Sequence, residues 1–178
     1  MDSINQNQEE KNHENLNSAD AIGKIKDLVD IAKTCFLSTQ PSAGESNGTR
    51  PMNVQEVDQQ GTLWFMVAND SHTYQDISAD SHVKLYFQGS PHSDFLFLEG
   101  TAVLSADKVR IKELWNPIMK TWFTEGEDDP RIALIKVSPE TGYYWDNKHG
   151  NVIAGIKTLI GAAVGKTLDD SIEGDITI

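Results

Sequence analysis

Short stretches of β-forming residues, separated by turns, recur along the chain between residues 35 and 145. Val, Ile, Phe, Tyr and Trp are concentrated in these stretches, whereas Gly, Pro, Asn and Asp lie between them. Strands that follow one another through short turns pair antiparallel, and short strands of this kind close best into a barrel. The predicted strands cover residues 35–39, 49–57, 62–68, 83–88, 95–104, 132–137 and 143–145.

Helical patterns flank these strands. Apolar residues recur at helical spacing after the capping residues 18–20, further helices begin at 69–71 and at Asp107, and residues 152–165 have the pattern of a closing helix. Residues 139–142, Pro-Glu-Thr-Gly, are predicted to form the turn between the last two strands. The predicted fold is therefore mainly β, an antiparallel barrel with flanking α-helices.

The two ends of the chain lack such patterns. Residues 1–18 are crowded with Asn, Gln and Glu and are predicted to form a disordered polar tail. Residues 167–178 are acidic without a core pattern and are predicted to form a second tail. One domain, residues 19–166, remains between them and is long enough to enclose a hydrophobic core.

Net charge and cysteine content restrict the function. The formal net charge of −12 opposes binding to nucleic acid or to an anionic membrane surface, although a local anion site remains compatible with it. The single cysteine, Cys35, lies in an apolar strand and is predicted to be a structural thiol. Without a signal peptide or an apolar run long enough to span a bilayer, we expect a cytoplasmic protein.

Two short motifs could bind an anion. Ser71, His72 and Thr73 follow a strand at a predicted helix start, where backbone N–H groups and hydroxyls favour a phosphate. Arg50 lies near the start of a strand, with Pro51 and Met52 after it, and could pair with a phosphate in a bidentate manner. Each motif also has an ordinary interpretation, a helix cap in the first case and a solvated arginine at a strand end in the second.

Aromatic residues could stack on a flat cofactor. The four tryptophans, Trp64, Trp115, Trp122 and Trp145, are numerous for a domain of this size, although core or interface packing is the alternative. The histidines have no metal-ligand spacing, and no nucleophile-elbow, Walker or dinucleotide-binding motif is present. No residue is identified as catalytic.

An ordered set of motifs resembles a known family. Over about residues 20–165 the chain is similar to the bacterial general stress proteins of the pyridoxamine 5′-phosphate oxidase-like superfamily. The motifs are Arg50-Pro51-Met52, Gly61-Thr62-Leu63-Trp64-Phe65-Met66, Ser71-His72, Val83-Lys84-Leu85-Tyr86-Phe87-Gln88, Glu99-Gly100-Thr101-Ala102, Leu114-Trp115-Asn116-Pro117, Trp122-Phe123, Asp128-Asp129-Pro130 and Tyr143-Tyr144-Trp145-Asp146.

The resemblance implies an FMN-binding split barrel that forms a homodimer with two flavins at the interface, with FAD as the alternative cofactor. It implies that Trp145 approaches the flavin from the partner subunit, and that the segment 115–122 lies near the flavin. The implied cofactor-binding residues are Arg50, Pro51, Met52, Trp64, Phe65, Met66, Ser71, His72, Thr73 and Trp145.

Two departures from the family pattern bear on function. Relatives place a lysine where this chain has Thr73, so the phosphate site is expected to be weaker. Basic residues for a substrate phosphate are missing near the C-terminus, apart from Lys148-His149-Gly150, so oxidation of pyridoxamine phosphate is not expected. A flavin-dependent oxidoreductase of unknown substrate is the leading hypothesis. The alternatives are a non-catalytic flavin-binding or flavin-sensing module and a structural dimer without a cofactor.

Overall fold

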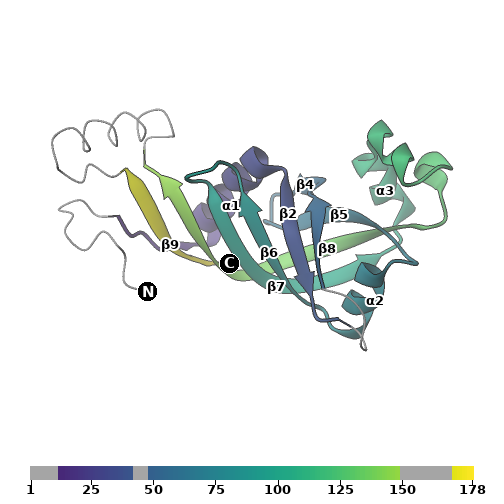
Figure 1. Ribbon diagram of the computed structural model, residues 1–178, viewed down its shortest axis with the longest axis horizontal. Helices are drawn as coiled ribbons and strands as arrows, with labels where there is room; N and C mark the ends of the chain where they lie inside the picture. The colour runs from purple at the N-terminus through teal and green to yellow at the C-terminus, as the bar shows by residue number, and fades with distance from the viewer. Residues whose placement is uncertain (1–11, 42–47, 149–169) are drawn as a thin grey trace.

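A nine-stranded sheet dominates the computed structural model, which describes residues 12–41, 48–148 and 170–178 (Figure 1). The sheet order is β1-β9-β8-β7-β6-β2-β3, and β4 and β5 are attached through a pairing of β5 with β8. All neighbours are antiparallel except β1 and β9. The strands are β1 (Leu16–Asn17), β2 (Thr34–Thr39), β3 (Thr49–Asn53), β4 (Glu56–Val57), β5 (Leu63–Ala68), β6 (His82–Gln88), β7 (Phe95–Ser105), β8 (Ile132–Asn147) and β9 (Ser171–Thr177).

Helices cover parts of this sheet. The α-helices are α1 (Ser18–Ala32), α2 (His72–Ala79) and α3 (Lys108–Leu114), and two short 3₁₀ helices follow, η1 (Pro117–Thr121) and η2 (Gly126–Asp128). None of the helices in the described residues is long and apolar enough to cross a membrane. The predicted mainly β, antiparallel architecture with flanking helices is therefore confirmed.

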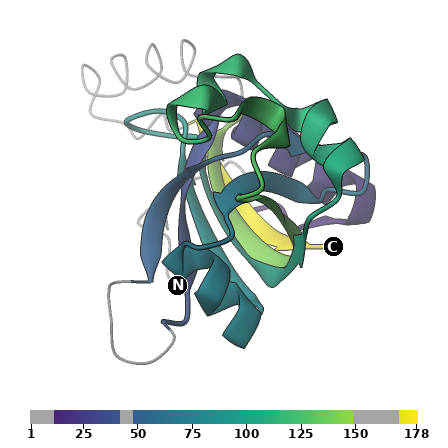
Figure 2. The ribbon, with the colours of Figure 1, turned by 90° about the vertical axis from the view of Figure 1, so that its right-hand side faces the viewer.

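The inner face of the curved sheet surrounds the main hydrophobic core (Figure 2). Alternation in β6 is regular: Val83, Leu85 and Phe87 are buried, and the residues between them are exposed. Helix α1 contributes Ile25 and Leu28 to the same core. A smaller cluster joins α3, η1 and the following residues to β5 and β8, through Met66, Ile111, Leu114, Met119, Phe123, Ile132 and Leu134.

The ladder of hydrogen bonds does not close into a complete barrel. The predicted strand 49–57 is divided into β3 and β4, because the chain leaves β2 after Asn53 and turns toward β5. The N–H of Val54 donates to the carbonyl of Lys33, whereas the N–H of Gln55 already donates to Trp64 of β5. Among the described strands, β3 is the last at its end of the sheet.

The predicted turn at residues 139–142 is wrong, because β8 continues through it as one strand of 16 residues. β7 pairs with β8 along its whole length and accommodates Pro139 with an irregularity between Glu99 and Gly100. Gly100 lies so close to β8 that a Cβ atom there would be 2.2 Å from the carbonyl oxygen of Ser138. The local turn signals are thus overridden by a long partner strand.

The predicted acidic tail is also wrong for residues 171–177, which form β9 between β8 and β1. Ile176 of this strand is 1% exposed, and Gly174 allows close approach of the backbone at Glu14. Residues 12–18 are likewise ordered, since they include β1 and the start of α1. The predicted disordered residues 1–11 and the closing helix 152–165 lie outside the described residues.

Candidate functional site

The outer face of the sheet carries a row of aromatic side chains. Pro51, Phe36, Tyr86, Phe97 and Tyr143 are directly opposite one another on five consecutive strands, from β3 to β8. Directly paired residues project from the same face of a sheet, so their side chains form a continuous band. Phe36 is 56% exposed and Tyr86 is 45% exposed, although large apolar groups of this kind are normally buried.

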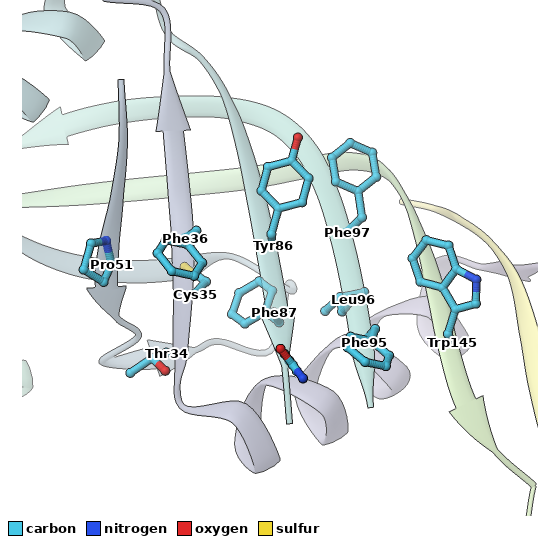
Figure 3. A pocket seen from close by; sticks show the side chains of 11 residues that line it. Thr34, Cys35, Phe36, Pro51, Tyr86, Phe87, Phe95, Leu96, Phe97 and Trp145 are labelled. Atoms are coloured by element: carbon cyan, nitrogen blue, oxygen red, sulfur yellow. The ribbon is translucent and has the colours of Figure 1, made fainter. Parts of the chain in front are cut away.

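A hollow of about 590 Å³ lies over this band. Figure 3 shows Phe36, Tyr86 and Phe97 side by side on adjacent strands, with Pro51 at one end and Trp145 at the other. The hollow is lined by Thr34, Cys35, Phe36, Pro51, Tyr86, Phe87, Gln88, Phe95, Leu96, Phe97 and Trp145. Its size is within the range of small-molecule sites, roughly 300–1,000 Å³, and its lining suits a flat aromatic ligand.

Strand β9 adds negative charge at the Trp145 end of the hollow. Trp145 is paired with Glu173, and Tyr143 is paired with Asp175. Burial, together with the two carboxylates and a hydrogen bond to Glu173, raises the pKa of Tyr143. The Trp145 end of the hollow is therefore aromatic, and the two carboxylates lie on the neighbouring strand β9 outside its lining.

Arg50 and Pro51 are neighbours in the chain but project from opposite faces of β3. Arg50 is paired with the buried Leu37, so its side chain lies on the inner side, where its Nη1 is 3.4 Å from Oδ2 of Asp76. The same carboxylate oxygen accepts a hydrogen bond from the hydroxyl of Thr39 at 2.8 Å. The predicted phosphate-binding arginine is thus held toward α2, next to a buried carboxylate.

The start of α2 has the predicted capping geometry. The hydroxyl of Ser71 accepts a hydrogen bond from the backbone N–H of Tyr74 at 3.2 Å, and the side chain of His72 is exposed. Thr73, where the family resemblance implies a lysine, is 3% exposed. The N-terminus of α2 therefore has the geometry of an ordinary helix cap. Asp76, further along the same helix, lies next to Arg50.

The predicted contacts from β5, and Met52 of β3, do not line the hollow. Phe65 is fully buried in the main core, Met66 is buried in the smaller cluster, and Met52 packs against the main core. Trp64 lies beneath Arg110, whose guanidinium carbon is 4.7 Å from the ring centroid, and its indole N–H donates to Asp58. Of the predicted cofactor residues, the structure brings Pro51 and Trp145 together at the hollow.

Sequence reasoning missed four aromatic residues of the outer band, Phe36, Tyr86, Phe97 and Tyr143. The signal was present: Tyr86 alternates with the buried Leu85 and Phe87, so its ring is on the solvent side of a strand that already has a complete buried face. Cys35 also lines the hollow, but burial raises the pKa of its thiol to about 12, which makes it a poor nucleophile.

Lys148 is the described residue of the candidate basic segment Lys148-His149-Gly150. The ammonium of Lys148 donates to the side chain of Asn12, at 2.6 Å. His149 and Gly150 lie outside the described residues.

Comparison with known proteins identifies the family. The family model described as pyridoxamine 5′-phosphate oxidase like matches residues 20–169. The chain therefore belongs to this family, as the ordered set of sequence motifs predicts.

Solved structures have the same fold. General stress protein 26 from Jannaschia sp. CCS1 has a TM-score of 0.75 and 20% identity, with 90% of this chain and 99% of that chain covered. The general stress FMN/FAD binding protein from Xanthomonas citri has a TM-score of 0.58 and 22% identity, with 68% of this chain and 84% of that chain covered.

The Neurospora crassa protein bli-3 is 26% identical over 133 residues, which span 68% of this chain and 64% of that protein's length.

Proposed function

We propose that this protein binds FMN on the outer face of the sheet as a homodimer and acts as a flavin-dependent oxidoreductase. The observation that carries the proposal is the band of exposed aromatic side chains beneath the hollow, which offers a flat apolar platform to an isoalloxazine ring. The family and the flavin named in the Xanthomonas citri relative support this assignment.

The residues present fit the ring of FMN better than its phosphate. Phe36 and Tyr86 are available for stacking, and Pro51 and Trp145 bound the platform. The phosphate would lie on the other side of the edge strand β3, between Arg50 and the start of α2 at Ser71. Arg50 already faces Asp76, so part of its charge is neutralised before any phosphate arrives.

Once bound, FMN would supply the redox chemistry, and the protein would bind, orient and shield it. The aromatic band excludes water from the lower face of the ring. A second copy of the chain would cover the upper face, and twofold symmetry would create two equal sites. Burial of Phe36 and Tyr86 in such an interface explains why two large aromatic side chains are left exposed in the single chain.

A non-catalytic flavin-binding or flavin-sensing module is the second candidate. The observation that favours it is the phosphate region, where Thr73 is buried and adds no positive charge and Asp76 competes for Arg50. Weak, exchangeable binding of FMN suits buffering or sensing better than it suits a tightly held catalytic cofactor.

A flavin titration followed by anaerobic reduction tests both candidates. Binding of FMN, FAD and riboflavin would be measured by quenching of flavin fluorescence, with the oligomeric state measured by light scattering in the same samples. We expect FMN to bind to a dimer more tightly than riboflavin. Reduction of the bound flavin by NADH or NADPH, with repeated turnover, supports the oxidoreductase, whereas binding without turnover supports the module. Failure of all three flavins to bind would refute both.

A further inference from the structure

Two polar side chains, those of Thr34 and Gln88, lie at one border of the hollow. Gln88 is adjacent to the buried Phe87 on β6, so its side chain projects from the outer face of the sheet. Thr34 has the same relation to the buried Cys35 on β2. Because these two buried residues are paired with each other, the next position of the register brings Thr34 beside Gln88. Both polar residues are exposed, and both line the hollow.

The turn after β6 orients the carboxamide of Gln88. Its Nε2 donates a hydrogen bond to the carbonyl of Ser90 at 3.2 Å. Among the residues that the structure describes, Oε1 of Gln88 accepts no hydrogen bond. The hydroxyl of Thr34 donates to the carbonyl of Ala32 at 3.4 Å, a long bond that a better acceptor can replace. The border thus offers a ligand one amide acceptor and one hydroxyl donor.

This polar border lies on the opposite side of the aromatic band from Arg50. On β2, the residue opposite Arg50 follows Phe36, whereas Thr34 precedes Phe36 by two residues. Figure 3 shows Thr34 beyond Phe36 on β2 and Phe95 beyond Phe97 on β7, at the same end of the hollow. A flavin with its phosphate at Arg50 and its ring on the band would therefore meet the polar border with an edge of the ring.

We propose that Gln88 selects the pyrimidine edge of the flavin ring, where an imide N–H lies between two carbonyl groups. Oε1 of Gln88 would accept a hydrogen bond from the imide N–H, and the hydroxyl of Thr34 would donate to a neighbouring ring carbonyl. In a mostly apolar pocket, a few polar groups of this kind set the orientation of the ligand. The inference rests on the proposed function and adds to it the direction of the ring, whose pyrimidine edge faces away from Arg50.

A flavin that lacks the imide hydrogen provides the test. Binding of FMN and of 3-methyl-FMN to the full-length protein would be measured by quenching of flavin fluorescence. We expect the methylated flavin to bind about three- to tenfold more weakly, the loss for one neutral hydrogen bond, because Oε1 of Gln88 is left without a donor. Both flavins carry the same phosphate, so the ratio of their affinities does not depend on where the phosphate binds.

Variants assign the effect to the polar border. Gln88→Met keeps the length of the side chain without its amide, so it should weaken FMN by about three- to tenfold and leave 3-methyl-FMN unchanged. Thr34→Val removes the hydroxyl and should weaken both flavins alike, because methylation of the imide retains the ring carbonyls. Gln60→Leu, at an exposed turn position outside the lining, is the control and should change neither affinity. Thermal unfolding of each flavin-free variant verifies the fold.

The outcomes separate this proposal from the flavin assignment. A preference for FMN over 3-methyl-FMN that disappears in the Gln88→Met protein supports the proposal. Equal affinities for the two flavins, or a preference that survives Gln88→Met, would overturn it while leaving flavin binding intact. Unchanged FMN affinity in the Thr34→Val protein would overturn the role of Thr34. Failure of both flavins to bind would overturn this proposal together with the proposed function.

Discussion

The guanidinium of Arg50 lies 3.4 Å from the carboxylate of Asp76, whose side chain is 4% exposed. This contact links β3 to α2. It places the predicted phosphate-binding arginine next to a competing anion. Asp76 also accepts a hydrogen bond from Thr39, so its position does not depend on Arg50 alone. Binding of a phosphate here must therefore share Arg50 with Asp76.

Arg50→Ala is expected to weaken FMN binding by about 1.5–3 kcal/mol, the range for a hydrogen bond to a charged group. Flavin fluorescence titration measures the change. Asp76→Asn is the matched control, because it removes the competing charge and keeps the size of the side chain, and it should leave FMN binding equal or tighter. Unchanged affinity in the Arg50→Ala protein would place the phosphate elsewhere.

Thr73→Lys is expected to have opposite effects on binding and stability. The added cation should tighten FMN and make its binding more sensitive to salt. Because Thr73 is 3% exposed, the flavin-free variant must accommodate an ammonium near the core, and its free energy of unfolding should fall by about 1–3 kcal/mol. Titrations at two salt concentrations and urea denaturation measure the two effects. Equal or weaker FMN binding in a folded variant argues against a phosphate at the start of α2.

Phe36→Asp is expected to convert a dimer into a monomer. Light scattering should give twice 19.7 kDa for the native protein and 19.7 kDa for the variant, because the substitution puts a charge in the centre of the proposed interface. The fold of the subunit should survive, since Phe36 is 56% exposed in the single chain. Val109→Asp, at a 69% exposed position on α3, is the control and should remain dimeric. A native protein that is monomeric and still binds FMN would refute the shared site.

Trp145→Ala is expected to weaken FMN by about 1–3 kcal/mol, the value for stacking one ring on an aromatic side chain. Trp145 is 39% exposed and packs on Tyr143, so the free energy of unfolding should fall by about 1–3 kcal/mol, and FMN binding is compared in the folded variant. Trp145→Phe retains a ring and should recover most of the affinity. A dimeric Trp145→Ala protein with unchanged affinity for FMN would exclude Trp145 from the site.

Cys35 is expected to be unreactive in the folded protein. Its thiol has a pKa raised from 9.0 to about 12 by burial, so the thiolate is scarce at neutral pH. As pH rises above 9, the unfolded chain loses the thiol proton before the folded protein does. The contribution of Cys35 to the free energy of unfolding therefore declines between pH 9 and about 12. Reaction with a thiol reagent at pH 8 should be slow in buffer and fast in urea. Fast reaction in buffer would show that the hollow opens to expose the thiol.

Local patterns predicted the elements whose partners are close in sequence. Helix α1 and strand β6 follow from their hydrophobic periods, and Ser71 and Asp107 accept the capping hydrogen bonds expected of them. The family could also be predicted, because its motifs are distributed in order along one chain. These features depend on nearest neighbours and on residue order, both of which are properties of the sequence.

The tertiary structure decided the other elements, because segments distant in the sequence supply the hydrogen bonds and packing that stabilise them. β7 keeps β8 extended through a Pro-Glu-Thr-Gly segment, and β8 with β1 converts an acidic segment into β9 by completing its hydrogen bonds. The same pairings bring Pro51, Tyr86 and Trp145, far apart in the chain, to one face, while Arg50 is turned to the other. The sequence by itself thus determined which chemical groups are available, and long-range strand register determined which of them meet, since a shift of one residue reverses the face of every side chain.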